Sequence, residues 1–151
     1  MASLTTHQRQ TLGAVLDALI PPRESLGGAG ALGLGDAVAR EVDKMSGALD
    51  ALGTDLAALD AAGGSRGAAA FAALEEPERS EALAAHAETD PGFLPGLVFH
   101  AYIAYYQDPR VVAALGLEPR PPHPEGYAME PTDLESLTAN IRTRAAFFRK
   151  P

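Results

Sequence analysis

Four histidines are the residues of this chain best suited to proton transfer or metal binding. They are His7, His86, His100 and His123. No two of them are four residues apart, and the sequence has no Cys/His spacing typical of zinc sites. Because His100 lies inside an apolar stretch and buried polar groups are usually paired, we expect it to be buried and bonded to a backbone carbonyl or a carboxylate. The sequence therefore predicts no catalytic or metal-binding histidine.

A glycine motif and an acidic cluster are two further patterns that could carry chemistry. Residues 28–33 (GAGALG) satisfy G-x-G-x-x-G, which binds a dinucleotide when a strand precedes it and a helix follows. Here a predicted helix and two prolines precede the motif, so we interpret it as a flexible loop. The acids Glu75, Glu76, Glu78 and Glu81 are most simply the solvated start of a helix. No G-x-S-x-G nucleophile motif occurs, and we predict neither catalytic nor cofactor-binding residues.

The most informative stretch is a helix predicted over residues 93–107 (FLPGLVFHAYIAYYQ), which is apolar on nearly every side. Such a helix must be buried on nearly every side. A chain of 151 residues can barely enclose it alone, so we expect a partner to cover part of it. Tyr102 and Tyr106 should share a face with Phe99, whereas Tyr105 should point elsewhere. For Tyr105 and Tyr106 we give core packing and contact with a partner equal weight, since tyrosine is enriched at interfaces.

The elements that must position these residues are all helical. The pattern predicts an irregular all-α, single-domain bundle of six to seven helices, because alanine is abundant, β-branched residues are few and no strand signal is visible. Up to residue 118 we expect helices over residues 6–20, 36–45 or 36–52, 54–62, 68–74, 77–87, 93–107 and 110–115. Asp36 should cap the second of these helices, and Phe71 should anchor the short fourth one.

The connections follow from turn and capping residues. The prolines at 21–22 should end the first helix, and residues 63–67 (GGSRG) should form a flexible break. Asp108, which precedes a proline, should cap the helix that follows it. A Pro-rich extended segment is expected over residues 119–131, before a last helix over residues 132–148 that Thr132 or Asp133 would cap.

Charge and composition exclude several classes of partner. The net charge is −8, which argues against nucleic acid and against anionic membrane surfaces. There is no cysteine, so disulfides and thiolate metal sites are excluded. The longest apolar run is far shorter than the roughly 20 residues that span a bilayer, so we expect no direct membrane insertion. No twin-Arg or apolar signal is visible, so we predict a cytoplasmic location, or a periplasmic one if this is a mature form or is exported with its partner.

Three motifs, in this order and spacing, give the chain a family resemblance. They are residues 16–22 (LDALIPP) before a Gly-rich loop, residues 105–109 (YYQDP) with Leu115-Gly116 soon after, and residues 122–127 (PHPEGY). The chain resembles the small-subunit family of gluconate 2-dehydrogenase, known as subunit 3 or the gamma subunit, over residues 6–127. The C-terminal helix is similar to a tail found in some members.

The resemblance implies an accessory role without catalysis. Members of this family pair with a large FAD-containing subunit of the glucose–methanol–choline type, which oxidises sugars, sugar acids or other alcohols. The small subunit would bind and stabilise that partner in a 1:1 or higher hetero-oligomer, and FAD would lie in the partner. Many members also supply a twin-Arg export signal, which is not visible here. The predicted interface residues are Tyr105, Tyr106, Asp108, Pro121, Pro122, Tyr127, Phe147, Phe148 and Arg149.

An alternative interpretation treats residues 1–151 as a protein that acts alone. It would be a helical ligand-binding domain or small enzyme with a pocket near His100, Tyr102, Tyr105 and Tyr106. A third possibility is a homo-oligomer that uses the same surface on a second copy of the chain.

Overall fold

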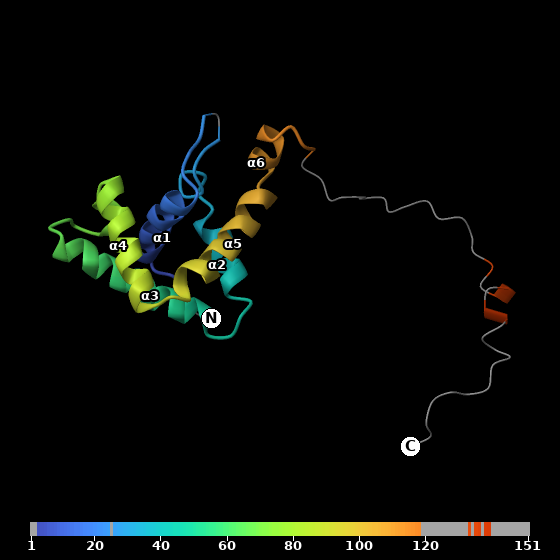
Figure 1. Ribbon diagram of the computed structural model, residues 1–151, viewed down its shortest axis with the longest axis horizontal. Coiled ribbons are helices and arrows are strands. Elements are labelled where there is room, and N and C mark those ends of the chain that lie inside the picture. The colour runs from blue at the N-terminus through green and yellow to red at the C-terminus, as the bar shows by residue number, and fades with distance from the viewer. Residues whose placement is uncertain (1–2, 25, 119–132, 134, 137, 140–151) are drawn as a thin grey trace, which may run out of the picture. The chain divides into compact units, whose positions relative to one another are not determined.

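The computed structural model describes residues 3–24 and 26–118, together with residues 133, 135, 136, 138 and 139. The described residues form helices and no β-strand, which confirms the predicted all-α class (Figure 1). The elements are α1 (Thr6–Leu19), α2 (Gly35–Val42), α3 (Ala48–Ser65), the 3₁₀ turn η1 (Phe71–Ala73), α4 (Glu76–Thr89), α5 (Phe93–Gln107) and α6 (Pro109–Ala114).

The contacts divide the chain into two units, residues 1–119 and 120–151, and all of these helices belong to the first. The predicted Pro-rich segment over residues 119–131 lies outside the described residues. Of the predicted helix over residues 132–148, only a few positions are described. Glu135 and Ser136 are helical, and their backbone amides donate to Asp133 Oδ1 at 3.1 Å each, as expected of a capping aspartate.

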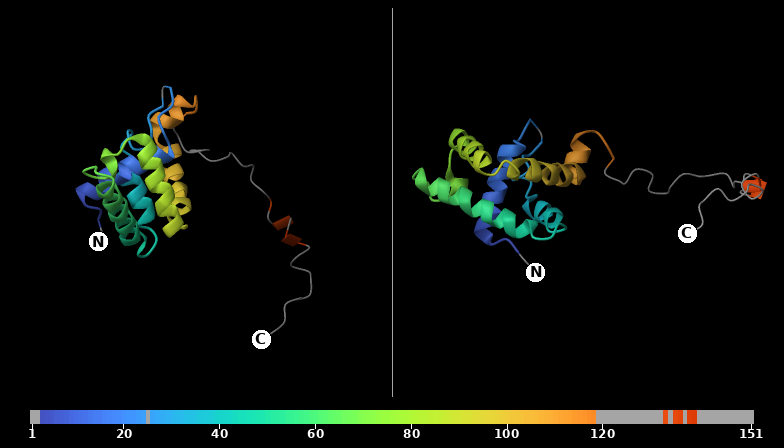
Figure 2. Two further views of the ribbon diagram at one scale, coloured as in Figure 1. Left: turned by 60° about the vertical axis from the view of Figure 1, so that its left-hand side comes forward. Right: turned by 60° about the horizontal axis from the view of Figure 1, so that its bottom comes forward.

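Helix α1 is the centre of the first unit. Leu12, Val15 and Leu16 are fully buried, and the helix contacts α2, α3, α4 and η1 (Figure 2). Its start is fixed by a capping box in which the Gln8 amide donates to Thr5 Oγ1 and the Thr5 amide donates to Gln8 Oε1. The predicted stop is also confirmed, because the helix ends just before the two prolines.

The predicted bounds of helix α3 are wrong at both ends. The predicted helix over residues 54–62 begins instead at Ala48, and it runs through Gly63 and Gly64 to Ser65 without the predicted break. Gly63 is buried, and a Cβ there would lie 2.6 Å from the backbone nitrogen of Phe71. Close packing of α3 on η1 therefore outweighs the low helix propensity of glycine. The chain turns only at Gly67, where φ is +84°.

Two smaller predictions are also wrong. The short helix expected over residues 68–74 is a single 3₁₀ turn, although Phe71 anchors it as expected and is fully buried. Asp36 does not cap α2, which begins at Gly35 without a side-chain cap. Asp36 lies within the first turn, and its carboxylate is 3.2 Å from Arg9 Nε of α1.

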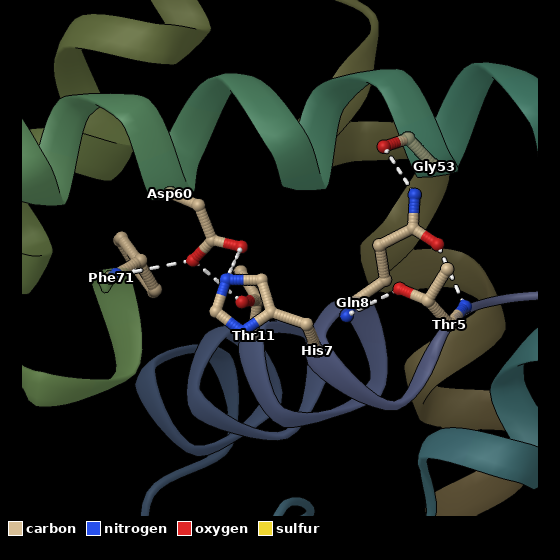
Figure 3. A network of polar contacts seen from close by, with 7 residues as sticks. All are labelled: Thr5, His7, Gln8, Thr11, Gly53, Asp60 and Phe71. Carbon is tan, nitrogen blue, oxygen red and sulfur yellow. Dashed lines mark hydrogen bonds and ion pairs between the residues drawn. The ribbon is translucent and has the colours of Figure 1, made fainter. Parts of the chain in front are cut away.

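A partly buried polar seam joins α1, α3 and η1 around the carboxylate of Asp60 (Figure 3). Its Oδ1 accepts hydrogen bonds from Thr11 Oγ1 at 2.7 Å and from the Phe71 amide at 3.2 Å. His7 Nε2 lies 2.9 Å from Oδ2. Thr11 is fully buried, so its hydroxyl has Asp60 rather than water as its acceptor. We call these residues the Asp60 seam.

Candidate partner-binding surface

Helix α5 buries one side in the core and leaves the other uncovered. Leu97, Ala101 and Tyr105 are buried on the inner side, whereas Phe99 is 63% exposed and Tyr106 is 56% exposed. Tyr102, at 47% exposed, lies on the outer side with them. The predicted division of the aromatic side chains between two faces is therefore confirmed. Helix α5 is apolar on nearly every side, yet the described part of the chain does not enclose it.

Next to the outer face of α5 is a groove of about 300 Å³, which we call the tyrosine groove. It is formed where the end of α1 and the loop after it approach the C-terminal half of α5 and helix α6. Its lining residues are Leu19, Ile20, Pro21, Arg23, Leu26, Tyr102, Tyr105, Tyr106, Val111 and Leu115. Most of these residues are aliphatic or aromatic, with three tyrosines on one wall, but polar atoms make up about half of the surface that lines the groove.

Ring contacts order these tyrosines. The rings of Tyr102 and Tyr106 are 5.9 Å apart and tilted, and those of Tyr105 and Tyr106 meet edge to face at 5.4 Å. Tyr105 is only 6% exposed, and its hydroxyl donates to the carbonyl of Gly27 at 3.2 Å. The structure therefore places Tyr105 in the core and Tyr106 on the surface, although the sequence left the two possibilities open for both.

The glycine motif forms a wall that packs tightly on α1 rather than a dinucleotide site. A Cβ on Gly28 would lie 2.4 Å from Asp17 Oδ1, and one on Gly30 would collide with the carbonyl of Gly13. The same Asp17 carboxylate accepts a hydrogen bond from the Ala31 amide at 2.9 Å. A helix precedes the motif, as expected, so the arrangement of a Rossmann site is absent from this described segment. These glycines are required because the loop backbone touches the helix.

Asp108 and Arg110 attach helix α6 to the same loop. Asp108 caps α6 as predicted, accepting from the Arg110 amide at 2.9 Å. The Arg110 guanidinium donates to both Asp108 oxygens and, at 2.7 Å, to the carbonyl of Leu32. The side-chain hydrogen bond from Arg110 lowers the pKa of the Asp108 carboxyl below its ordinary value, although burial opposes the shift. Two of the three segments that carried the family resemblance, 16–22 and 105–109, therefore meet through the Gly-rich loop, whereas the third, residues 122–127, lies outside the described residues.

His100 lies in a different depression. It is 8% exposed and borders a cleft of about 250 Å³ formed by α2, α3 and α5, with Asp55 and Asp90 also on the lining. Its Nδ1 is buried without a hydrogen-bond partner among the described residues, so the expected pairing with a carbonyl or carboxylate is wrong for this atom. His100 does not line the tyrosine groove. The single pocket suggested for His100 and the tyrosines is therefore two separate depressions.

The other predicted interface residues are not placed. Pro121, Pro122, Tyr127, Phe147, Phe148 and Arg149 lie outside the described residues, so their assignment stays a prediction. Sequence reasoning did not find Arg23 or Leu26, which reach the groove from a loop about 80 residues away from the tyrosines along the chain. No local pattern marks such residues, because their position depends on how the loop folds back.

The described residues also bear on metal and membrane sites. They contain no group of three or more histidine, aspartate and glutamate side chains placed to hold a metal ion. None of the helices in the described ranges is long and apolar enough to cross a membrane.

The fold and this surface define a small helical protein with an uncovered aromatic groove. The sequence model of the family described as gluconate 2-dehydrogenase subunit 3 matches residues 6–121, and the chain belongs to this family. The search of curated proteins and the search of solved structures gave no significant match.

Proposed function

We propose that this chain is a non-catalytic accessory subunit that binds and stabilises a large FAD-dependent dehydrogenase subunit. The partner would oxidise sugars, sugar acids or other alcohols, and it would hold the flavin. The family description supports a role as a dehydrogenase subunit. The nature of the partner follows from the resemblance in the sequence, and a cytoplasmic location remains a prediction.

The observation that carries the proposal is the apolar surface along α5 and the segment after it. Phe99, Tyr102, Tyr106, Leu115 and Leu117 are each about half exposed or more. With aromatic side chains of about 150–250 Å² each, these five residues expose on the order of 500 Å². One partner in a stable complex contributes about 800 Å². The exposed surface therefore supplies much of what an interface core requires.

Stabilisation of the partner follows from binding linkage. A subunit that binds only the folded partner raises its free energy of unfolding by RT ln(1 + [L]/Kd), about 2.7 kcal/mol at a concentration one hundred times Kd. No catalytic residue in this chain is needed for that effect. The described residues of the tyrosine groove suit the task, because tyrosine and arginine are typical of energetically dominant contacts.

Co-expression tests the proposal. A candidate large flavoprotein subunit of the glucose–methanol–choline type should be produced with and without this chain, and the measurements are bound FAD, dehydrogenase activity and melting temperature. We expect the three quantities to be higher when the chain is present, and the two proteins to elute together. A flavoprotein that is equally folded, FAD-loaded and active alone would refute the proposal.

The His100 cleft supports a second candidate function, the binding of a small molecule. His100 Nδ1 is buried beside a mostly apolar cleft and has no hydrogen-bond partner among the described residues, so a bound ligand could supply one. The cleft of about 250 Å³ is smaller than the roughly 300 Å³ at which ligand pockets begin, so it ranks second. A stable monomer at high concentration, with a melting temperature that rises in a metabolite screen, would favour this candidate.

A further inference from the structure

The charge of the tyrosine groove differs from that of the whole chain. The chain carries 20 acidic and 12 basic residues. Of the described residues, no carboxylate lines the groove, and the only charged side chain on its lining is that of Arg23. Glu24, the next residue, is exposed but is not among the lining residues. In the described part of this acidic chain, a groove lined by aliphatic and tyrosine side chains therefore carries a single charge, and that charge is positive.

Hydrogen bonds fix the backbone of Arg23, whereas no described residue forms an ion pair with its side chain. The Arg23 amide donates to the Leu26 carbonyl at 2.9 Å, and the Leu26 amide donates back at 2.7 Å. Within the part of the chain that the structure describes, the Arg23 guanidinium forms no ion pair. The turn also holds Glu24 at φ +46°, a conformation uncommon for a residue other than glycine. The turn thus presents an unpaired cation at the edge of the groove.

We propose that the tyrosine groove accepts an apolar segment of the large subunit that carries a carboxylate, and that this carboxylate pairs with Arg23. The inference rests on the proposed function. The apolar side chains of the segment would pack against Tyr102 and Tyr106, which the described part of this chain leaves about half exposed. The planar guanidinium donates two parallel hydrogen bonds to a carboxylate, a geometry that lysine does not reproduce. Charge complementarity therefore selects an acidic segment over a neutral or basic one.

Charge reversal tests the pairing. In the complex of this chain with its flavoprotein, Arg23→Glu should weaken binding by about tenfold or more at low salt. The difference from the unmodified chain should shrink as salt rises, because screening weakens an exposed pair. Arg23→Lys keeps the charge but loses the two-pronged geometry, so it should weaken binding less than Arg23→Glu does.

Arg40→Glu is the matched control. Arg40 is exposed on α2 and does not line the tyrosine groove. Its reversal to Glu changes the net charge of the chain by the same amount as Arg23→Glu. We expect its effect on Kd to be less than about twofold. Equal weakening by the two reversals, or an Arg23→Glu chain that binds as tightly as the unmodified chain, would overturn the pairing but leave the accessory role intact. Failure of the unmodified chain to bind the flavoprotein at all would instead refute the proposed function, and the pairing with it.

A photo-crosslinking residue in place of Tyr106 provides a readout that does not depend on the folding of a charge variant. The captured peptide of the large subunit should contain an aspartate or glutamate within a few residues of apolar side chains. A captured peptide without any acid would overturn the inference. If Arg23→Glu melts below the unmodified chain, Arg23→Gln replaces it, and binding by that variant with unchanged Kd and salt dependence would be an equally clear contradiction.

Discussion

Two regions, one along the first half of α1 and one at its C-terminal end, show how this chain uses polar and apolar groups. At the first, the Asp60 seam, a partly buried carboxylate satisfies a hydroxyl of α1 and an amide of η1 within the chain itself. At the second, the tyrosine groove, the end of α1 borders aromatic rings that the described chain leaves half uncovered. The Oδ1 atom of Asp60 finds its donors within the chain, whereas we propose that the tyrosine groove needs another surface against it. The difference separates residues that stabilise the fold from residues available for binding.

The comparison predicts the largest loss of stability for a change at the seam. Asp60→Ala would leave the buried Thr11 hydroxyl and the Phe71 amide without their acceptor. Because an unsatisfied buried group costs about 1–3 kcal/mol, we expect the free energy of unfolding to fall by about 3 kcal/mol. Asp60→Asn keeps one acceptor oxygen and should lose only about 1 kcal/mol. Urea unfolding followed by circular dichroism measures both, and an Ala variant as stable as the original would show that the seam does not stabilise the fold.

A second test uses two adjacent glycines of α3. Gly63→Ala would place a methyl group 2.6 Å from the Phe71 backbone nitrogen, which cannot move without displacing η1. Overpacking of this kind costs typically 1–3 kcal/mol, so we expect a loss of about 2 kcal/mol. Gly64→Ala meets nothing within 4 Å and should stabilise the helix by up to about 1 kcal/mol. Thermal melts of the two variants should shift in opposite directions, and shifts of the same sign would contradict the packing of α3 on η1.

Neighbouring tyrosines test whether the two roles are separable. Tyr106→Ala should change the free energy of unfolding by no more than about 0.5 kcal/mol, because the side chain is largely exposed. It should weaken binding to the large subunit by about 2 kcal/mol, as expected for a dominant interface tyrosine. Tyr105→Phe should do the reverse, losing about 1 kcal/mol of stability with its bond to Gly27 while binding stays nearly constant. Titration calorimetry and urea unfolding of both variants measure the two effects. A Tyr106→Ala chain with unchanged Kd would exclude the groove as the binding surface.

The sequence predicted local features around the tyrosine groove and missed the contacts between distant segments. The capping residue Asp108, the stop at residues 21–22 and the two faces of α5 follow from spacing within a few residues, and the structure confirms them. The continuation of α3 through Gly63 could not be predicted from local spacing, because it depends on the close approach of Phe71 to the helix. Likewise, no local pattern pairs Asp60 with Thr11, which lie 49 residues apart. Propensity describes a segment alone, whereas these contacts are decided by packing between segments.

The same limit applies to His100. Its position inside an apolar helix predicted burial correctly, and the general rule that buried polar groups are paired predicted a partner for it. The described residues supply none for Nδ1, because the surrounding lining is mostly aliphatic and aromatic. Burial can thus be predicted from the sequence, whereas the identity of a hydrogen-bond partner depends on which residues distant in sequence pack nearby.

The smallest expected effect concerns pH at the start of helix α6, whose later residues border the groove. Hydrogen bonding to Arg110 lowers the pKa of Asp108 in the folded chain, so ionised Asp108 contributes stability that is fully present above the ordinary aspartate pKa. That contribution is lost as pH falls through the lowered folded value. Asp108→Asn retains a capping side chain but no charge, so its stability deficit should be greatest near neutral pH and should vanish in acid. Urea unfolding of both chains from neutral to strongly acidic pH measures the difference. A deficit that persists unchanged in acid would assign the role of Asp108 to its cap alone, and the charged contact with Arg110 would then not hold α6 against the loop.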